Sequence, residues 1–258
     1  MISQPFKAAG AFIKALPLIV SPQLRLFILA PFLANILLMG LVYVLALSYF
    51  NHLVTVAMDY MPEWLSFLNW FFYIIFAAIT SVLLFYSFSV GINILAAPFM
   101  AFLAEKVEEK QTGKVFDEVL TGKVLLAIVL RSLQRELQKI LYFLPRFVLL
   151  LLLSFIPIVN VIAPFLLLLF STWMLALQYM DYAFDNNKVP FHEMRMALRS
   201  KPLMCWTFGA IVMVSLAIPV LNLFIMPIAV VAATLLWISV FRPTHGEYAS
   251  LLDLSNKA

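Results

Sequence analysis

Residues 147–179 read FVLLLLLSFIPIVNVIAPFLLLLFSTWMLALQY, a run of thirty-three residues without a charged side chain. A membrane-spanning helix takes about 20 residues, so two spans and a hydrated turn need a longer run. Proline ends helices, and division at Pro157 and Pro164 leaves arms of about 10 and 15 residues, or ~15 and ~22 Å. Neither arm crosses ~30 Å of hydrocarbon. The run therefore predicts a re-entrant hairpin with Asn160 at its tip, and two ordinary spanning helices with an apolar turn are the alternative.

The pattern occurs a second time. Residues 218–227 read IPVLNLFIMP and repeat the Ile-Pro-x-x-Asn order of residues 156–160, again followed by a proline. Hydrophobic segments interrupted by proline at corresponding positions of a repeat are typical of transporters and channels. A second half-penetrating hairpin is therefore expected over residues 203–241, with Asn222 at its tip.

The composition indicates the class of protein. A chain of 258 residues that is 64% hydrophobic and 12% charged, with a mean hydropathy of +1.02, is an all-α integral membrane protein. We expect one membrane domain made of an interfacial amphipathic helix over 1–20, membrane-spanning helices over 22–50 and 64–98, charged helices over 99–146, the hairpin over 147–179, a charged connection over 181–201, the second hairpin over 203–241 and a tail over 242–258.

The distribution of basic residues predicts the orientation. None of the 17 Lys and Arg residues lies in residues 51–63, the connection between the two expected spanning helices. If both hairpins return to the side that they enter from, all the basic segments share one face. The positive-inside rule assigns that face, with both termini, to the cytoplasm.

The sequence argues against enzymatic chemistry. The pair His192-Glu193 has no second histidine four residues on, so no zinc-protease motif is present. Asp181 and Asp185 are one helical turn apart but have no third ligand at helical spacing, so we expect no metal site there. The single cysteine is Cys205, and the seven glycines form no phosphate loop. We expect no cofactor, and the dispersed charges predict no nucleic-acid partner.

Two sets of polar residues are candidates for anion handling. The first set lies at the start of a predicted helix and consists of Pro22, Gln23, Leu24 and Arg25. Unpaired backbone amides and a guanidinium group lie together there, which suits an oxyanion such as sulfate. The alternative is that Arg25 reaches the headgroups with its charged end.

The second set consists of Arg131, Arg135, Glu136 and Lys139. It forms either a solvated helix face or an ion-pair network at the mouth of a path. Asn160 and Asn222 either line that path or join helices by hydrogen bonds.

Several stretches resemble one family, the CysZ-type sulfate permeases of the bacterial inner membrane. They are Asn35–Gly40, Ala96–Phe99, Leu144-Pro145-Arg146, the run from Gln178 to Phe191 that Glu193-Met194-Arg195 continues, and Leu221–Pro227. The resemblance covers nearly the whole chain. It implies two long membrane helices, two half-penetrating hairpins and a homodimer or a dimer-based homo-oligomer.

The same resemblance implies a function. It is sulfate entry into the cytoplasm for cysteine synthesis, with sulfite as a competitor or regulator. The family's Gly-x-Arg-Arg-like sulfate stretch maps here to Gln23, Leu24 and Arg25, with one arginine instead of two. No ATP-binding motif is present, so transport is expected to be channel-like or ion-coupled. The competing hypothesis is a non-transporting membrane scaffold that binds partners through residues 99–146.

Overall fold

The computed structural model describes residues 3–21, 24, 69–114, 122–157 and 159–243, with ten scattered residues between 33 and 60. Every element within these residues is a helix, which confirms the all-α prediction for the described part of the chain. Most of the predicted helix over 22–50 and of the tail over 242–258 lies outside it. The chain divides into two compact units, residues 29–97 and the remainder, and each is described by itself.

The long helix α3 runs from Asn69 to Thr112, and its residues up to Ala97 belong to the smaller unit. It contains most of the charge-free run that was expected to span the membrane and continues past Pro98 into the charged segment. Gly113 ends it with a φ of 71°, a left-handed conformation that favours glycine, and its N–H donates to the Glu109 carbonyl at 2.8 Å.

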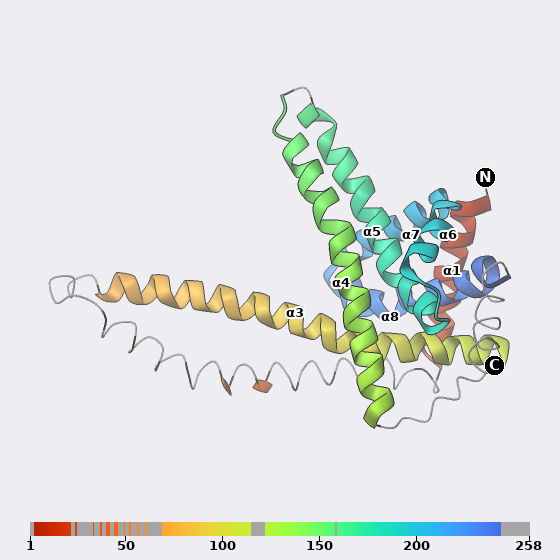
Figure 1. Ribbon diagram of the computed structural model, residues 1–258, viewed down its shortest axis with the longest axis horizontal. Helices are drawn as coiled ribbons and strands as arrows, with labels where there is room; N and C mark the ends of the chain where they lie inside the picture. Colours follow the sequence, from red (N-terminus) through yellow and green to blue (C-terminus); the bar gives the residue numbers. More distant parts are fainter. Residues whose placement is uncertain are drawn as a thin grey trace. The chain divides into compact units, whose positions relative to one another are not determined.

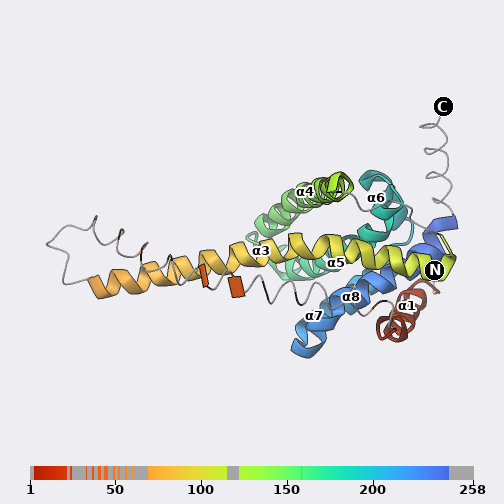
Figure 2. The same ribbon diagram turned by 90° about the horizontal axis from the view of Figure 1, so that it is seen from below.

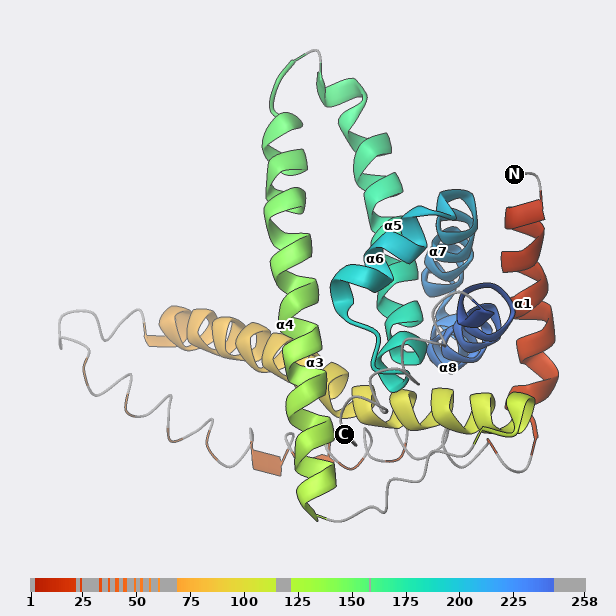
Figure 3. The ribbon, with the colours of Figure 1, turned by 45° about the vertical axis from the view of Figure 1, so that its right-hand side comes forward.

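The larger unit contains the other helices, and Figure 1 labels its α-helices. They are α1 (Ser3–Ile19), α4 (Gly122–Leu153), the 3-10 turn η2 (Val159–Val161), α5 (Ala163–Asn186), α6 (Phe191–Arg199), α7 (Pro202–Ala217), α8 (Pro219–Leu236) and the π-helix η3 (Trp237–Phe241). The helices α4 and α5 are the two arms of a hairpin (Figures 1 and 3). Seen from below, α5 lies between α4 on one side and α7 with α8 on the other (Figure 2).

Prolines set the starts of four of these helices. Pro164, Pro202 and Pro219 lie in the first turns of α5, α7 and α8, and Pro190 directly precedes α6. The first turn of a helix has unpaired N–H groups, so the donor that proline lacks is not missed there, and its fixed φ already suits the helix. Prolines that were expected to end helices therefore also begin them.

The two repeated segments differ in their turns. In both, the asparagine N–H donates to the carbonyl of the isoleucine four residues earlier: Asn160 to Ile156 at 2.9 Å and Asn222 to Ile218 at 2.8 Å. The first segment takes nine residues, 154–162, to connect its helices. The second takes Ile218 alone, because Pro219 can occupy the first helical position. The second proline of this segment, Pro227, lies inside α8.

The arms of the first hairpin are longer than the charge-free run. The helix α4 begins 25 residues before Phe147, and α5 continues seven residues beyond Tyr179. In the described part of the chain, two helical stretches are long and apolar enough to cross a membrane, Ala163–Asn186 and Phe224–Phe241. A third arises if α6 and α7, which meet at a bend of 101°, form one broken span.

Close backbone contact holds α5 against α7. A side chain at Gly209 would place its Cβ 1.7 Å from the Thr172 carbonyl oxygen, so only glycine permits this approach. At the ends of α5 and α8, the ring of Phe184 packs edge-on against Trp237 with centroids 4.5 Å apart. These contacts fix the end of α5 that carries the charged side chains described below.

The N-terminal helix α1 forms as expected but presents its apolar residues differently. Its small residues Ala8, Ala11 and Ala15 are buried with Phe12, and the helix packs on α7 and α8. Other apolar side chains of this helix, Phe6, Ile13 and Leu16, are exposed. Small residues let helices approach closely, so α1 is part of the bundle as well as a helix with an apolar outer surface.

Candidate functional site

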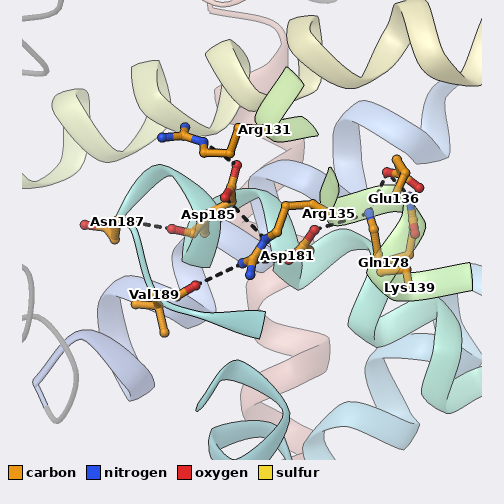
Figure 4. A network of polar contacts seen from close by, with 10 residues as sticks. Arg131, Arg135, Glu136, Lys139, Gln178, Asp181, Asp185, Asn187 and Val189 are labelled. Atoms are coloured by element: carbon orange, nitrogen blue, oxygen red, sulfur yellow. Dashed lines mark hydrogen bonds and ion pairs between the residues drawn. The ribbon is translucent and has the colours of Figure 1, made fainter. Parts of the chain in front are cut away.

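Three basic side chains of α4 meet two carboxylates of α5. Arg131, Arg135 and Lys139 recur at four-residue steps and therefore share one face of α4. On α5, Asp181 and Asp185 have the same spacing. The two helices place the basic row against the acidic pair, and Figure 4 shows the resulting network, which we call the ion-pair ladder: Arg131, Arg135, Glu136, Lys139, Asp181 and Asp185.

Arg135 is the centre of the ladder. Its Nη2 lies 2.9 Å from Asp181 Oδ1 and donates to the carbonyl of Val189 at 3.1 Å. Its Nε lies 3.3 Å from Asp185 Oδ1. The Arg135 and Asp181 side chains are 8% and 5% exposed, so this pair is shielded from water. Charge-assisted contacts of this kind are strong, and removal of one partner leaves a buried charge without compensation.

The two ends of the ladder differ in exposure. Lys139 Nζ, whose side chain is 4% exposed, lies 2.6 Å from Glu136 Oε1 and 3.2 Å from Asp181 Oδ2. At the other end, Arg131 Nε lies 3.2 Å from Asp185 Oδ2 and its side chain is 36% exposed. Gln178 donates from Nε2 to Glu136 Oε1 at 3.3 Å. The three cations and three carboxylates cancel.

The loop after α5 supports this geometry. Val189 N–H donates to the Phe184 carbonyl at 3.0 Å and Lys188 N–H to the Asp185 carbonyl at 2.8 Å. Lys188 has a φ of 57°. This is the Schellman arrangement, in which a left-handed residue ends the helix and the next residue packs back on it. It brings the Val189 carbonyl to Arg135.

A second buried carboxylate, Glu108 of α3, adjoins this loop. Asn187, which caps α5, donates from Nδ2 to Glu108 Oε2 at 2.7 Å and accepts from Lys114 Nζ at 2.7 Å. The indole of Trp237 donates to Glu108 Oε1 at 3.4 Å, and Arg242 Nε lies 3.9 Å from the same oxygen. Glu108 therefore ties the ends of α3, α5 and η3 together.

The structure brings together only some of the predicted site residues. Arg131, Arg135, Glu136 and Lys139 form one network, and the burial of Arg135 and Lys139 contradicts the alternative of a solvated helix face. Arg135 does not pair with Glu136, because adjacent helical residues point in different directions. Its carboxylate partners are Asp181 and Asp185. Lys139 does pair with Glu136.

The other predicted residues lie apart from the ladder. Asn160 in η2 and Asn222 in the first turn of α8 are exposed, and neither side chain has a hydrogen-bond partner among the described residues. Gln23 and Arg25 lie outside those residues. Leu24 is buried, and its N–H, which was expected to face an anion, donates to the Ser21 carbonyl at 3.0 Å.

Sequence reasoning missed the roles of Asp181, Asp185, Glu108 and Asn187. The aspartates were considered only as metal ligands, although their spacing matches that of the arginines. Within the described residues, no three His, Cys, Asp or Glu side chains converge as metal ligands would. The matching i, i+4 spacing of the basic row and the acidic pair is the signal that could have suggested the ladder. Nothing in the local sequence singles out Glu108 or Asn187.

The fold and the ladder define an α-helical membrane protein with ionisable side chains buried between helices, the class that includes transporters and channels. Comparison with known proteins gives the family. The chain belongs to the family described as Sulfate transporter CysZ/Etoposide-induced protein 2.4, whose model matches residues 11–227. This confirms the resemblance found in the sequence.

Several curated relatives carry the name Sulfate transporter CysZ. The protein from Pseudomonas syringae is 47% identical over 226 residues, which cover 87% of this chain and 89% of that protein. The proteins from Pseudomonas fluorescens and Pseudomonas aeruginosa are 44% and 43% identical, over 87% of this chain and 90% and 92% of their own lengths. The family and these relatives are named for transport and not for an enzymatic reaction.

Proposed function

We propose that this chain carries sulfate across the bacterial inner membrane into the cytoplasm, where it supplies cysteine synthesis. The observation that carries the proposal is the 43–47% identity to proteins named as sulfate transporters over 87% of the chain. Both termini face the cytoplasm. Transport is channel-like or ion-coupled, and sulfite acts as a competitor or regulator.

The first hairpin enters the membrane only halfway. Its tip is apolar and exposed to the surroundings, with Phe155 at 77% and Val161 at 69% exposure, so it suits lipid better than water. Arg146 precedes the last residue of α4, Leu153, by seven residues, or about 11 Å along a helix. A tip at the bilayer centre, ~15 Å deep, places Arg146 near the headgroups, whereas a tip at the far surface would hold it in hydrocarbon.

The ion-pair ladder acts as the gate. With its charges cancelled it offers sulfate no net attraction, and a sulfate ion binds Arg135 only by displacing Asp181 or Asp185. Incoming sulfate first passes the hairpin-tip residues Asn160 and Asn222, which line the path, and then reaches Arg131, Arg135, Glu136 and Lys139. Gln23 and Arg25 form the sulfate contact on the cytoplasmic side, at the start of the first long helix.

A second copy of the chain covers the outer face of α4. That face has exposed apolar side chains at alternating steps of three and four residues: Leu130, Leu133, Leu137, Ile140 and Leu144. These side chains lie before Arg146, so a half-inserted hairpin leaves them outside the hydrocarbon. The steps are those of a coiled-coil seam, which another helix of the same kind can cover.

A cross-linking experiment tests this contact. Cys205, the single cysteine, is buried, so a Cys205→Ala background leaves Leu137→Cys as the only thiol. We expect this variant to form a disulfide-linked dimer in membranes, while Leu203→Cys, exposed on α7, should not. A monomer in both cases would refute the proposed contact.

Radiolabelled sulfate uptake into proteoliposomes tests the function itself. We expect uptake by the wild type that sulfite but not chloride inhibits, and at least a tenfold loss in Arg25→Ala. Asp181→Asn removes one carboxylate from the ladder, and we expect it to bind sulfate more tightly than the wild type because the ladder gains net positive charge. No uptake by folded, inserted wild-type protein would favour the scaffold hypothesis. Unchanged sulfate binding by Asp181→Asn would remove the ladder from the path.

A further inference from the structure

Two arginines next to the ladder have no counter-charge among the described residues. Arg146 of α4 and Arg195 of α6 both lie against the ring of Tyr142, with guanidinium carbons 3.9 Å and 4.9 Å from its centroid. Among the described residues, no carboxylate lies within ion-pair distance of either one. They differ in this from Arg131, Arg135 and Lys139, each of which pairs with an aspartate.

The surrounding rings hold the two guanidinium groups in place. Arg146 folds back along α4 and donates from Nη1 to the Tyr142 carbonyl at 2.7 Å. Tyr142 is buried and meets Phe191 edge-on with centroids 6.2 Å apart, and Arg195 lies 5.2 Å from the Phe191 centroid. The cation–π contacts fix the positions of the charges without neutralising them.

The two charges lie within reach of one shared anion. Because both guanidinium carbons lie close to one ring centroid, they are at most about 9 Å apart, the sum of the two distances, and repel each other. An oxyanion that accepts N–H···O bonds of about 2.8 Å from two arginines holds their guanidinium carbons up to roughly 8 Å apart, which is within this limit. The Nε of Arg195 is buried and has no hydrogen-bond partner among the described residues.

We propose that Arg146 and Arg195, held on Tyr142, bind a tetrahedral oxyanion. The ligand is a dianion or monoanion with several equivalent oxygens, which the planar fork of arginine matches in shape. Two sources offer this chemistry at the depth of the lipid headgroups, free sulfate and the phosphate group of a lipid.

For sulfate, the inference rests on the proposed function and adds a resting site to the path. Tyr142 and Arg146 continue the row of Arg131, Arg135 and Lys139 along the same face of α4, in steps of three and four residues. The uncompensated pair is thus the next basic position after the charge-balanced ladder, on the side of the hairpin tip. An ion held there lies beside the gate before the gate opens.

Binding measurements on single substitutions test the site. The variants are Arg146→Gln and Arg195→Gln, and the matched control is Arg199→Gln, which removes the same charge from an exposed position on α6. One arm measures radiolabelled sulfate binding by a scintillation proximity assay in lipid-free detergent. The other arm measures phosphatidylglycerol retained per protein by native mass spectrometry. A Tyr142→Phe variant retains the ring, and Tyr142→Leu removes it.

We expect Arg146→Gln, Arg195→Gln and Tyr142→Leu to bind at least tenfold less sulfate or lipid than the wild type in one arm. In both arms, Arg199→Gln and Tyr142→Phe should bind within twofold of the wild type. Loss in the sulfate arm identifies the transported ion as the ligand, and loss in the lipid arm identifies a lipid phosphate. If the Gln variants aggregate, Arg146→Lys and Arg195→Lys keep the charge but not the fork, and the loss should persist.

The inference is overturned if folded Gln or Lys variants match the wild type in both arms. That result leaves the proposed function intact if wild-type uptake persists. Conversely, absent wild-type uptake with a loss in the lipid arm refutes the proposed function and retains the oxyanion site.

Discussion

Replacement of Asp181 by asparagine removes one charge from the centre of the ion-pair ladder at nearly constant volume. In the wild type, its two oxygens lie 2.9 Å from Arg135 Nη2 and 3.2 Å from Lys139 Nζ. Asp185 still faces Arg135 in the variant, and Glu136 still faces Lys139, but three cations then share two carboxylates. The change therefore tests whether buried charge balance holds α4 against α5.

The expected loss follows from the burial of the pair. Two unit charges about 4 Å apart attract each other by ~4 kcal/mol at an effective dielectric constant of 20. Removal of one partner from a buried pair costs about 3–5 kcal/mol, since the other charge stays buried. Because a chain of this size loses about 2–4 °C in Tm per kcal/mol, we expect Asp181→Asn to lower Tm by roughly 10 °C. Thermal unfolding in detergent, followed by tryptophan fluorescence, measures this.

Two controls isolate the cause. Glu109→Gln breaks the pair with Lys106 on the surface of α3, which is worth less than about 1 kcal/mol, so Tm should fall by only a few degrees. The double variant Arg135→Gln/Asp181→Asn restores charge balance and should be less destabilised than the sum of its single changes. Additive losses in the double variant, or equal losses in Asp181→Asn and Glu109→Gln, would refute the reasoning.

Four further substitutions have expected effects on the same measurement. Gly209→Ala places a Cβ 1.7 Å from the Thr172 carbonyl oxygen and should lower stability by more than about 3 kcal/mol, or prevent folding. Gly10→Ala meets no atom within 4 Å and, as a helix substitution, should raise stability by about 1 kcal/mol, so a loss there would contradict the α1 packing. Gly113→Ala, at a φ of +71°, should cost about 1 kcal/mol through backbone strain alone. Glu108→Gln weakens buried charge-assisted bonds and should cost about 2 kcal/mol, and a neutral result would show that its contacts are not formed.

Much of the fold follows from the sequence because lipid leaves few choices to a backbone. Long apolar runs must be helical where no water can satisfy their N–H and C=O groups, and the turn between α4 and α5 lies at the Ile-Pro-x-x-Asn segment. The difference between the two repeats could not be predicted. A proline in an apolar segment is compatible with a turn, a helix start or a helix interior, and Pro157, Pro219 and Pro227 take these three places.

For the candidate site, the sequence predicts which basic side chains lie together but not which carboxylates they pair with. Helical spacing identifies which side chains share a face, so Arg131, Arg135 and Lys139 could be grouped from their positions alone. Their partners depend on which helix packs opposite and at what height, and that is decided by contacts far apart in the chain. One such contact joins Asn187 and Glu108, 79 residues apart.

The cancelled charges of the ladder have an electrical consequence. Each sulfate ion moves two negative charges inward against an interior-negative voltage, at a cost of about 2.3 kcal/mol per charge per 100 mV. A ladder with no net charge does not attract the anion along its path, so the voltage opposes entry unaided. The voltage also sets the equilibrium, and passive entry at 100 mV would stop at a cytoplasmic sulfate level more than a thousandfold below the outside level. Net uptake through this protein thus depends on rapid consumption of sulfate inside the cell or on a co-transported cation. In the first case, the sulfate current should reverse with voltage. In the second case, it should reverse with the cation gradient.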